Sequence, residues 1–450
     1  MPVLLATDAL VWLLVLAVAA FTWYSSRRPH LAAPWARVFR SPAAVGSCVV
    51  LVAYVLVGLL DSLHFRPALP AKDPKATVAY AVEVRSVLDA ALGVLRSRTE
   101  RTYSAPLATR LYQKEQVEQP DGKSLREFPR LRHGGAHLKD DAGWGKDLAS
   151  RVFGGWVAAL VVWLILFFGT QKILKRRWSH VPWTAAYAAL GALLAVAGPA
   201  AALADGYHVL GTDRIGQDVL YQALKSIRTS LVIGTLTTLV LLPVGIAAGI
   251  AAGYFKGWVD DAIQYVYTTL NSIPGVLLIA ASVLMVQVYV DTHPDLFPTV
   301  AQRSDFRLLS LCVILGALGW TGLARLLRGE ALKLSELEYI QAAHAFGVSH
   351  ARILGRHILP NVSHIIVIAL VMDFSGLVLA EAVLSYVGVG VDPSTTSFGT
   401  MINAARLEMA REPMVWWSLA AAFFFMFALV LAANLFADAV RDGFDPRVRV

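Results

Sequence analysis

Residues 330–361 read EALKLSELEYIQAAHAFGVSHARILGRHILPN and form a polar segment between two long apolar runs. Ser335 and Glu338 have the spacing of a capping box, which predicts that a helix begins there. Gly347 suits the left-handed backbone conformation that commonly ends a helix. The segment therefore predicts a short helix that stops at a sharp turn.

A second helix is expected directly after this turn. Ser349 can supply its N-cap, and Pro360 should stop the helix or kink it into the next apolar run. Ile353, Leu354 and Ile358 would form its apolar side. The expected product is a helix–turn–helix on the cytoplasmic face, a short stiff element suited to transmitting force from a partner.

The composition around this segment is that of a membrane protein. The chain has 450 residues, of which 56% are hydrophobic and only 16% are charged, against roughly 25% charged in soluble domains. Its net charge of +8 does not by itself indicate nucleic acid, because the position of Lys and Arg relative to the apolar runs is the better test. Cys48 and Cys312 lie inside apolar runs and offer no disulfide framework.

Nine apolar runs are long enough to cross a bilayer, which takes about 17–25 mostly apolar residues. The first is the weakest, because it is short and could be a cleaved or interfacial segment. Pro243 lies inside the fifth, where neighbouring helices can satisfy the carbonyl that it frees. The predicted fold class is all-α, in the membrane. The runs lie at about 8–24, 44–60, 153–170, 183–204, 228–254, 262–290, 308–324, 363–388 and 415–437.

The distribution of Lys and Arg orients these spans. Linkers 25–43 and 171–182 carry basic residues and no acidic residue, so the positive-inside rule places both in the cytoplasm. Alternation of nine spans then puts the N-terminus outside and the C-terminus inside. The short outer segments obey the same rule with two Lys or Arg each; they are 205–227, 291–307 and 389–414.

Segment 61–152 is expected to be a periplasmic insert. It holds 16 basic and 12 acidic residues, and a long loop of this kind is translocated largely regardless of its charge. Apolar residues near helical spacing predict a helix over 76–98. The stretch 119–147 is rich in Gly, Asp and Lys and is expected to be loop.

The hairpin sequence resembles the EAA loop of ABC importer permeases, which docks into a cleft on the ATPase subunit. The matching residues are Gln341-Ala342-Ala343, Gly347 and Leu359-Pro360. The longer run is similar to the oligopeptide/dipeptide (peptide/nickel) branch of this family, in its second-permease type. The resemblance implies an ATPase-coupling loop that includes Glu338, Gln341, Ala342, Ala343, Gly347, Arg356, His357, Leu359 and Pro360.

One position of the hairpin departs from the family pattern. The family has glutamate where this chain has Gln341, so the charge is lost while shape and hydrogen bonding largely survive. Glu338, one turn earlier, could replace that charge. Taken without the resemblance, the segment would be an ordinary amphipathic cytoplasmic hairpin.

Two further segments resemble the same branch. The first, 210–219, has Gln217 where the branch usually has arginine. Thr212 or Asp213 can cap a helix there that should lie along the outer membrane surface, although the segment could also be a plain connector. The second segment covers 381–399 and follows the fifth core span of the family.

The resemblance covers 205–450 and the span 44–60, which together would form the six-span core of a type I ABC importer permease. The rest of the chain would be additions to that core. The expected parts are an extra N-terminal span with a basic linker (1–43), the first core span (44–60), the periplasmic insert (61–152), two additional spans (153–204) and the remaining core (205–450) with coupling loop 325–362.

Two carboxylates lie inside the eighth apolar run. Asp373 is near its middle and Glu381 is toward its outer end, on similar helix faces. A charge in the membrane costs about 2.5–3.5 kcal/mol, so each should face a cavity or a partner. They either line the translocation path or form buried contacts at a subunit interface.

Two weaker patterns do not indicate further sites. Residues 122–124 resemble the end of a phosphate-binding loop, but Val117 stands where its first glycine is required, so the chain should carry no ATPase site. Four histidines recur every six or seven residues, and the turn should scatter them; they are His344, His350, His357 and His364. No catalytic, cofactor or metal site is expected.

The resemblance implies transport by alternating access in a bacterial inner membrane. A periplasmic binding protein would deliver a peptide, two ATPase subunits would bind ATP and push on the hairpin, and a second homologous permease would complete the pair. The chain itself would be no enzyme and would bind lipid but no nucleic acid. The alternatives are an ion-coupled secondary transporter or channel, which leaves the hairpin unexplained, and an importer of nickel or an oligosaccharide.

Overall fold

A computed structural model describes residues 1–69, 80–118 and 124–444. Within these residues, nine helices are long and apolar enough to cross a membrane, and each contains one of the nine predicted runs or a large part of it. The all-α membrane fold is confirmed. The helices of the membrane and hairpin regions are α1 (Ala6–Ser26), α2 (Pro29–Val38), α3 (Pro42–Asp61), α6 (Trp144–Arg177), α7 (Trp183–Ala204), α8 (Val219–Phe255), α9 (Gly257–Ser272), α10 (Gly275–Thr292), α11 (Val300–Gly319), α12 (Thr321–Ser335), α13 (Glu338–Ala345), α14 (His350–Ile353), α15 (Leu359–Val387), α16 (Phe398–Glu408) and α17 (Trp417–Phe444).

The sixth predicted span, 262–290, is two helices rather than one. α9 ends at Ser272 and α10 begins at Gly275, and between them Ile273 is extended and precedes Pro274. A proline disfavours helical backbone in the residue before it, which ends the helix at that point.

α8 is at the centre of the helical assembly and packs against α3, α11, α12 and α15. A Cβ added to Gly249 would lie 2.6 Å from the carbonyl oxygen of Ala324, and one added to Gly253 would lie 2.5 Å from that of Arg328. Glycines therefore allow the backbones of α8 and α12 to approach closely, as small residues do between membrane helices. Pro243 lies inside α8, which continues through it as expected.

The insert contains two small sheets. β1 (Pro2–Val3) pairs antiparallel with β2 (His64–Phe65), and β2 pairs with β3 (Arg85–Ser86). β4 (Glu115–Glu118) and β5 (Ser124–Glu127) form an antiparallel hairpin of their own. The first sheet places the N-terminus beside the insert.

The prediction of one helix over 76–98 is wrong. Residues 76–79 lie outside the described part, and the remainder contains β3 and two short helices, α4 (Val87–Ala91) and α5 (Gly93–Ser97). Ser86 forms a capping box that starts α4 only after the strand. Local capping therefore outweighs the apolar periodicity.

The predicted loop over 119–147 is also wrong for much of its length. Residues 119–123 lie outside the described part, but the rest contains β5, a 3₁₀ turn at Asp141–Gly143 and the start of α6 at Trp144. α6 thus extends beyond the apolar run 153–170 toward the insert. Its polar first turns bond to the insert and to the segment before α8, which stabilises helix where composition favours loop.

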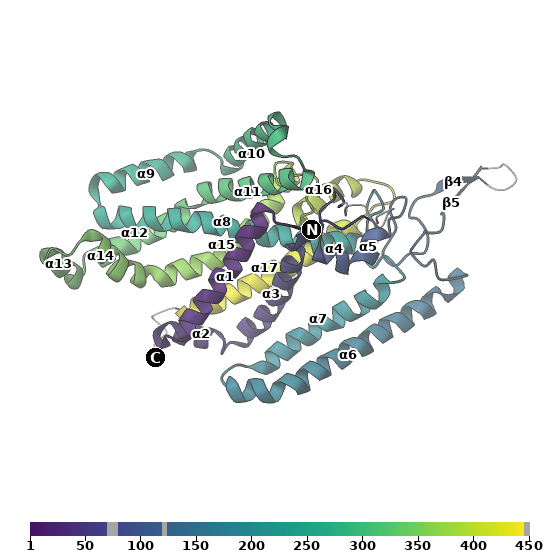
Figure 1. The fold of residues 1–450 in the computed structure, drawn as a ribbon, viewed down its shortest axis with the longest axis horizontal. Coiled ribbons are helices and arrows are strands. Elements are labelled where there is room, and N and C mark those ends of the chain that lie inside the picture. Colours follow the sequence, from purple (N-terminus) through teal and green to yellow (C-terminus); the bar gives the residue numbers. More distant parts are fainter. Residues whose placement is uncertain (70–79, 119–123, 445–450) are drawn as a thin grey trace, which may run out of the picture.

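Opposite ends of the molecule carry the segments that the charge pattern assigns to opposite sides of the membrane (Figure 1). One end holds α2, the α6–α7 turn, the α13–α14 hairpin and the end of α17. The other end holds α4, α5 and the protruding β4–β5 hairpin. This arrangement agrees with nine alternating spans and an outer insert.

The first apolar run, the weakest of the nine in the sequence, belongs to the folded assembly. Asp8 of α1 is fully buried and lies 2.6 Å from the guanidinium of Arg228 and 2.7 Å from the ring of His64. The backbone N–H of Thr7 donates to Asp305 of α11 at 3.2 Å. Buried charges are retained only with such partners, so these contacts attach the outer end of α1 to α8 and α11.

α6 and α7 form a peripheral hairpin beside α3 (Figure 1). A Cβ on Gly155 would lie 2.6 Å from the Cα of Pro199, and one on Gly198 would lie 2.5 Å from the carbonyl oxygen of Gly155. The two added spans therefore form one tightly packed unit, and α7 connects that unit to α3.

Candidate coupling hairpin and outer junction

The hairpin between α12 and α15 contains the left-handed turn that the sequence predicts. Gly347 has a φ of +73°. Its N–H donates to the carbonyl of His344 at 3.0 Å, and the N–H of Val348 donates to the carbonyl of Ala343 at 3.0 Å. This pair of bonds is a Schellman motif, which closes the C-terminal end of α13.

The start of the hairpin differs from the prediction. Ser335 is the last residue of α12, and its hydroxyl donates to the carbonyl of Leu332 at 2.7 Å. α13 begins at Glu338, and Leu337 before it makes no side-chain cap. The predicted capping box is wrong because α12 continues and uses the serine for a bond within its own last turn.

The second arm of the hairpin runs into the membrane span. α14 is followed by a π turn over Leu354–Ile358 and then by α15, so Pro360 does not stop the helix. Pro360 is within the first two positions of α15, where a missing N–H is tolerated, and the π turn sits directly before it. Ser349 holds the N-cap position as predicted but makes no side-chain bond.

The apolar side of the hairpin packs against its own chain. Ile353 and Ile358 are fully buried in one cluster with Ile340 of α13 and Leu327 of α12. The opposite side is free, and Phe346 at the turn is 86% exposed. Of the predicted coupling residues, Ala343 and His357 are half-buried and the others are exposed, namely Glu338, Gln341, Ala342, Gly347, Arg356, Leu359 and Pro360.

A carboxylate that sequence reasoning missed lies beside Gln341. The amide Nε2 of Gln341 is 3.4 Å from Oε2 of Glu336. Glu336 also forms an ion pair with Lys256, and this pairing lowers the pKa of Glu336. The side-chain bonds of Gln341 thus go to Glu336 rather than to Glu338. The contact with Gln341 is local, but sequence spacing could not show the ion pair that holds Glu336, because Lys256 directly follows α8.

The turn brings two histidines together, so the expectation that it scatters all four is wrong. Oη of Tyr254 lies 2.7 Å from Nε2 of His344 and 2.9 Å from Nδ1 of His350. His357 instead contacts the ring of Tyr339. The tyrosine joins both arms of the hairpin to the end of α8. Across the described residues, no group of three or more metal-binding side chains is found.

At the end of the molecule that carries the insert, the helix predicted before the fifth span forms the first turns of α8, so the prediction of a separate surface helix capped by Thr212 or Asp213 is wrong. Residues 211–217 form a turn, and α8 begins at Val219, where the carboxylate of Asp218 accepts the N–H of Tyr221 at 3.1 Å. α8 then runs unbroken into the membrane. The two residues expected to cap that helix make other bonds. Asp213 accepts a bond within the turn, and Thr212 accepts one from the insert.

This turn attaches the insert to the core. Gly216 has a φ of +76°, and a Cβ there would lie 2.0 Å from the carbonyl oxygen of Glu100. The N–H of Ser104 donates to the hydroxyl of Thr212 at 2.7 Å, and the indole of Trp417 donates to the carbonyl of Thr212 at 2.9 Å. Insert, turn and α17 therefore meet at one junction.

His208 lies buried at the same junction between two carboxylates. Its Nδ1 is 2.8 Å from Asp218 and its Nε2 is 3.4 Å from Glu100. Burial alone would lower the pKa of His208, but the two carboxylates outweigh it and raise the pKa to about 9. Burial alone would raise the pKa of Glu100, but His208 and three backbone N–H groups of 132–134 lower it to about 2. The histidine is therefore charged at neutral pH.

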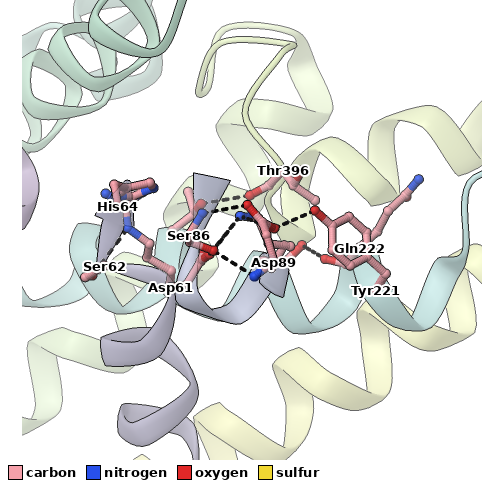
Figure 2. Close-up of polar contacts among 12 residues, drawn as sticks. Asp61, Ser62, His64, Ser86, Asp89, Tyr221, Gln222 and Thr396 are labelled. Atoms are coloured by element: carbon pink, nitrogen blue, oxygen red, sulfur yellow. Dashed lines mark hydrogen bonds and ion pairs between the residues drawn. The ribbon is translucent and has the colours of Figure 1, made fainter. Parts of the chain in front are cut away.

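A second polar cluster joins the insert to α8 (Figure 2). Nζ of Lys225 lies 2.7 Å from Asp61 and 3.0 Å from Asp89. Ser86 donates to Asp61 at 2.6 Å, and Tyr221 donates to Asp89 at 2.7 Å. These residues are far apart in the sequence, so no local pattern could have indicated the cluster.

Glu381 stabilises the segment 381–399 through hydrogen bonds. It is fully buried, and its Oε1 accepts from Ser385 at 2.7 Å and from Ser397 at 2.8 Å. A Cβ on Gly399 would lie 2.8 Å from the same oxygen, which explains why this position is glycine. Asp373 is half-buried and takes no part in these bonds. The structure therefore does not bring the two carboxylates together.

A cavity of about 360 Å³ lies next to this motif, between α10, α11, the end of α15 and α16. Its wall includes Ser385, the hydrogen-bond donor to Glu381. Its wall combines apolar residues of α10 and α11 with polar ones, among them Gln287, Arg307 and Asp392. The cavity is large enough for a small polar solute.

Known proteins share the core of this chain. Residues 245–450 match the family of binding-protein-dependent transport system inner membrane components. The oligopeptide transport system permease protein OppC of Mycobacterium tuberculosis is 32% identical over 242 residues, which cover 54% of this chain and 77% of that protein. The glutathione transport system permease protein GsiD of Pectobacterium atrosepticum is 33% identical over 244 residues, 54% of this chain and 73% of that protein. The dipeptide transport system permease protein DppC of Lactococcus lactis is 30% identical over 240 residues, which cover 53% of this chain and 64% of that protein.

These matches confirm the resemblance that the hairpin motif first indicated. They also agree with the apolar helices, which place the chain in the inner membrane as a multi-pass protein. Members of the family are transport permeases rather than enzymes, as expected for this chain. The chain belongs to the oligopeptide and dipeptide family of permeases, the membrane-spanning subunits of binding-protein-dependent ABC importers.

Proposed function

We propose that this permease imports short peptides or peptide-like solutes. The observation that carries the proposal is the similarity to three relatives whose names give an oligopeptide, a dipeptide and glutathione as the solute. A peptide backbone is the chemistry that these three solutes share. Nickel and oligosaccharides find no support in these names.

The hairpin is the part that couples ATP hydrolysis to movement. Its outward face, from Glu338 through Gly347 to Pro360, seats in a cleft of an ATPase subunit. Its inward face is packed on α12, and the second arm continues through the π turn into α15. A push on the turn is therefore transmitted to the helix that carries Asp373 and Glu381, which fits a rigid-body transition between inward and outward states.

The complete importer contains two ATPase subunits, which bind the ATP, a second homologous permease and a periplasmic binding protein. The outer cavity beside Glu381 and the half-buried Asp373 mark the side of the chain that lines the translocation path. In this proposal, residues 44–60 and 205–450 form the permease core. Residues 1–43, 61–152 and 153–204 are additions to it.

The insert helps to seat the binding protein. It lies at the outer end, where such a protein arrives, and its β4–β5 hairpin protrudes from the body of the molecule (Figure 1). The inner part of the insert is bonded to α8 through Lys225 and to the turn before α8 through Glu100. A partner held by the protruding part would therefore be positioned relative to the core.

Reconstitution of the complete importer in proteoliposomes tests the proposal. Uptake of a labelled dipeptide, a longer peptide, glutathione, Ni²⁺ and an oligosaccharide is measured with and without ATP and binding protein. Peptide uptake that needs both supports it. Uptake driven by an ion gradient without ATP contradicts the importer mechanism, and ATP-dependent uptake of only Ni²⁺ or sugar contradicts the peptide assignment.

A further inference from the structure

An apolar groove of about 340 Å³ lies between α3 and α7. Val52, Leu56 and Cys48 line it from α3, and Leu190 and Leu193 line it from α7. Among the side chains that the structure describes, none that forms this wall is charged. Its volume falls within the roughly 300–1,000 Å³ of ordinary ligand pockets, yet its surface offers nothing to a polar solute.

The groove has the depth and shape of a lipid-chain site. α3 begins at Pro42 and α7 at Trp183, both at the cytoplasmic end, and the lining residues run from there to Leu56 and Leu193. The wall therefore extends from the membrane surface past the middle of α3 and to the middle of α7. Val52 and Leu56 are 51% and 57% exposed, so the groove is open on the side where lipid lies.

Basic residues are close in the sequence to the residues that line the cytoplasmic end of the groove. Phe39, in the groove wall, is followed by Arg40, and Trp178, also in the wall, comes shortly after Lys175 and Arg176. The two linkers that carry these residues contain no acid. Basic pockets between membrane helices on the cytoplasmic side are suited to anionic lipid headgroups.

The tryptophans at the mouth of the groove are residues typical of the membrane–water interface. The indole of Trp183 donates to the carbonyl of Trp178 at 3.1 Å, so its polar group is satisfied and its ring is free to face the groove. Tryptophan is enriched at the level of lipid headgroups for this combination of an apolar ring and a polar N–H. The mouth therefore lies at the membrane–water interface.

We propose that this groove binds one anionic phospholipid, with an acyl chain between α3 and α7 and the headgroup at the basic linkers. A protein helix is the less suitable occupant, because a groove of about 340 Å³ is small for a helix and its cytoplasmic end adjoins basic linkers. The bound lipid would fill the space between the core and the α6–α7 hairpin, which is held to the core through α7. It would thus brace the added spans against α3.

Native mass spectrometry of the purified importer, after exchange into nanodiscs of phosphatidylglycerol or phosphatidylcholine, tests the proposal. Wild type should retain a phosphatidylglycerol molecule and lose phosphatidylcholine. Val52→Trp fills the groove and should abolish retention. Val55→Trp is the matched control, since Val55 is also exposed on α3 at 40% but lies outside the groove wall.

A second variant tests the headgroup contact without altering the groove. Replacement of Arg40, Lys175 and Arg176 by glutamine should weaken phosphatidylglycerol retention at least tenfold while the permease remains assembled. Equal retention in the Val52 and Val55 variants would overturn the site, and equal retention of both lipids by wild type would overturn the charge contact. If a photo-crosslinker at Val52 captured another protein subunit instead of lipid, the groove would be a protein-binding site and the lipid proposal would be overturned.

Discussion

Gly347 is the residue on which the shape of the coupling hairpin depends. Its φ of +73° closes the end of α13, and a Cβ there would meet no atom within 4 Å. Any effect of substitution therefore comes from backbone strain rather than from a clash. For a bulky residue in this conformation the strain is about 1–3 kcal/mol.

We predict that Gly347→Val uncouples ATP hydrolysis from transport, because the turn must open to relieve the strain. In reconstituted importers, peptide uptake should fall about tenfold or more while ATPase activity persists. Gly322→Val is the matched control, since Gly322 of α12 lies outside the hairpin, is exposed, is equally free of neighbours and has no positive φ. Wild-type coupling in Gly347→Val would disprove the role of the turn.

The buried His208 predicts a pH dependence of the outer junction. Its pKa is raised from 6.5 to about 9 by Asp218 and Glu100. A raised pKa adds stability that is complete below the unfolded value near 6.5 and is lost as pH rises through about 9. The melting temperature of the purified permease should therefore fall between pH 6.5 and 9.5.

His208→Gln removes the charge, so at pH 6.5 this variant should melt at a lower temperature than wild type. Its melting temperature should also fall much less than that of wild type as the pH rises to 9.5. The control is His180→Gln, because His180 is exposed on the turn between α6 and α7. Thermal melts of the three proteins over this pH range make the comparison. Parallel pH profiles for wild type and His208→Gln would show that the junction does not depend on this proton.

Among the elements, the β4–β5 hairpin is the part of the insert that can be removed without disturbing the core. The inner part of the insert is fixed to α8 by Lys225, Glu100 and Thr212, so its removal would expose buried polar groups. The bond from the N–H of Leu111 to the carbonyl of Pro129 closes the base of the protruding part. A deletion beyond that bond leaves the base intact.

Deletion of 114–128 with a Gly-Ser bridge should therefore preserve assembly and melting temperature. We expect the affinity for the substrate-loaded binding protein to fall several-fold, because the protruding surface is gone. Surface plasmon resonance with the immobilised importer measures this affinity, and a Gly-Ser insertion at 206 tests whether junction damage alone has the same effect. Unchanged affinity in the deleted importer would refute the seating role.

At the scale of the whole molecule, the structure and the charge pattern agree on which segments share a side of the membrane. The hairpin and the basic linkers are at one end and the insert is at the other (Figure 1). Single cysteines at Ser26, Ser124 and Ser179, in a chain with both native cysteines replaced by alanine, report this directly. An impermeant thiol reagent added to intact cells should label only the cysteine at 124, whereas labelling at 179 and not at 124 would invert the topology.

Local sequence predicted those features of the site that depend on backbone chemistry within a few residues. Gly347 ends α13, and the apolar residues Ile353 and Ile358 form one buried side, as their spacing indicates. Prediction failed where a competing contact, local or distant, decided. α12 takes Ser335 into its last turn, and Tyr254 of α8 draws two histidines of the hairpin together.

The sequence alone determined the membrane class, the nine spans and the family, and it predicted the orientation of the spans, because hydrophobic length, Lys/Arg placement and short motifs are properties of the chain read in order. The tertiary structure decided which residues and segments contact one another. It placed Glu336 next to Gln341, the insert on the turn before α8, and Glu381 in a closed set of bonds with serines. Apart from the bond between Glu381 and Ser385 within α15, these contacts join residues from separate elements, so they exist only once the helices have packed.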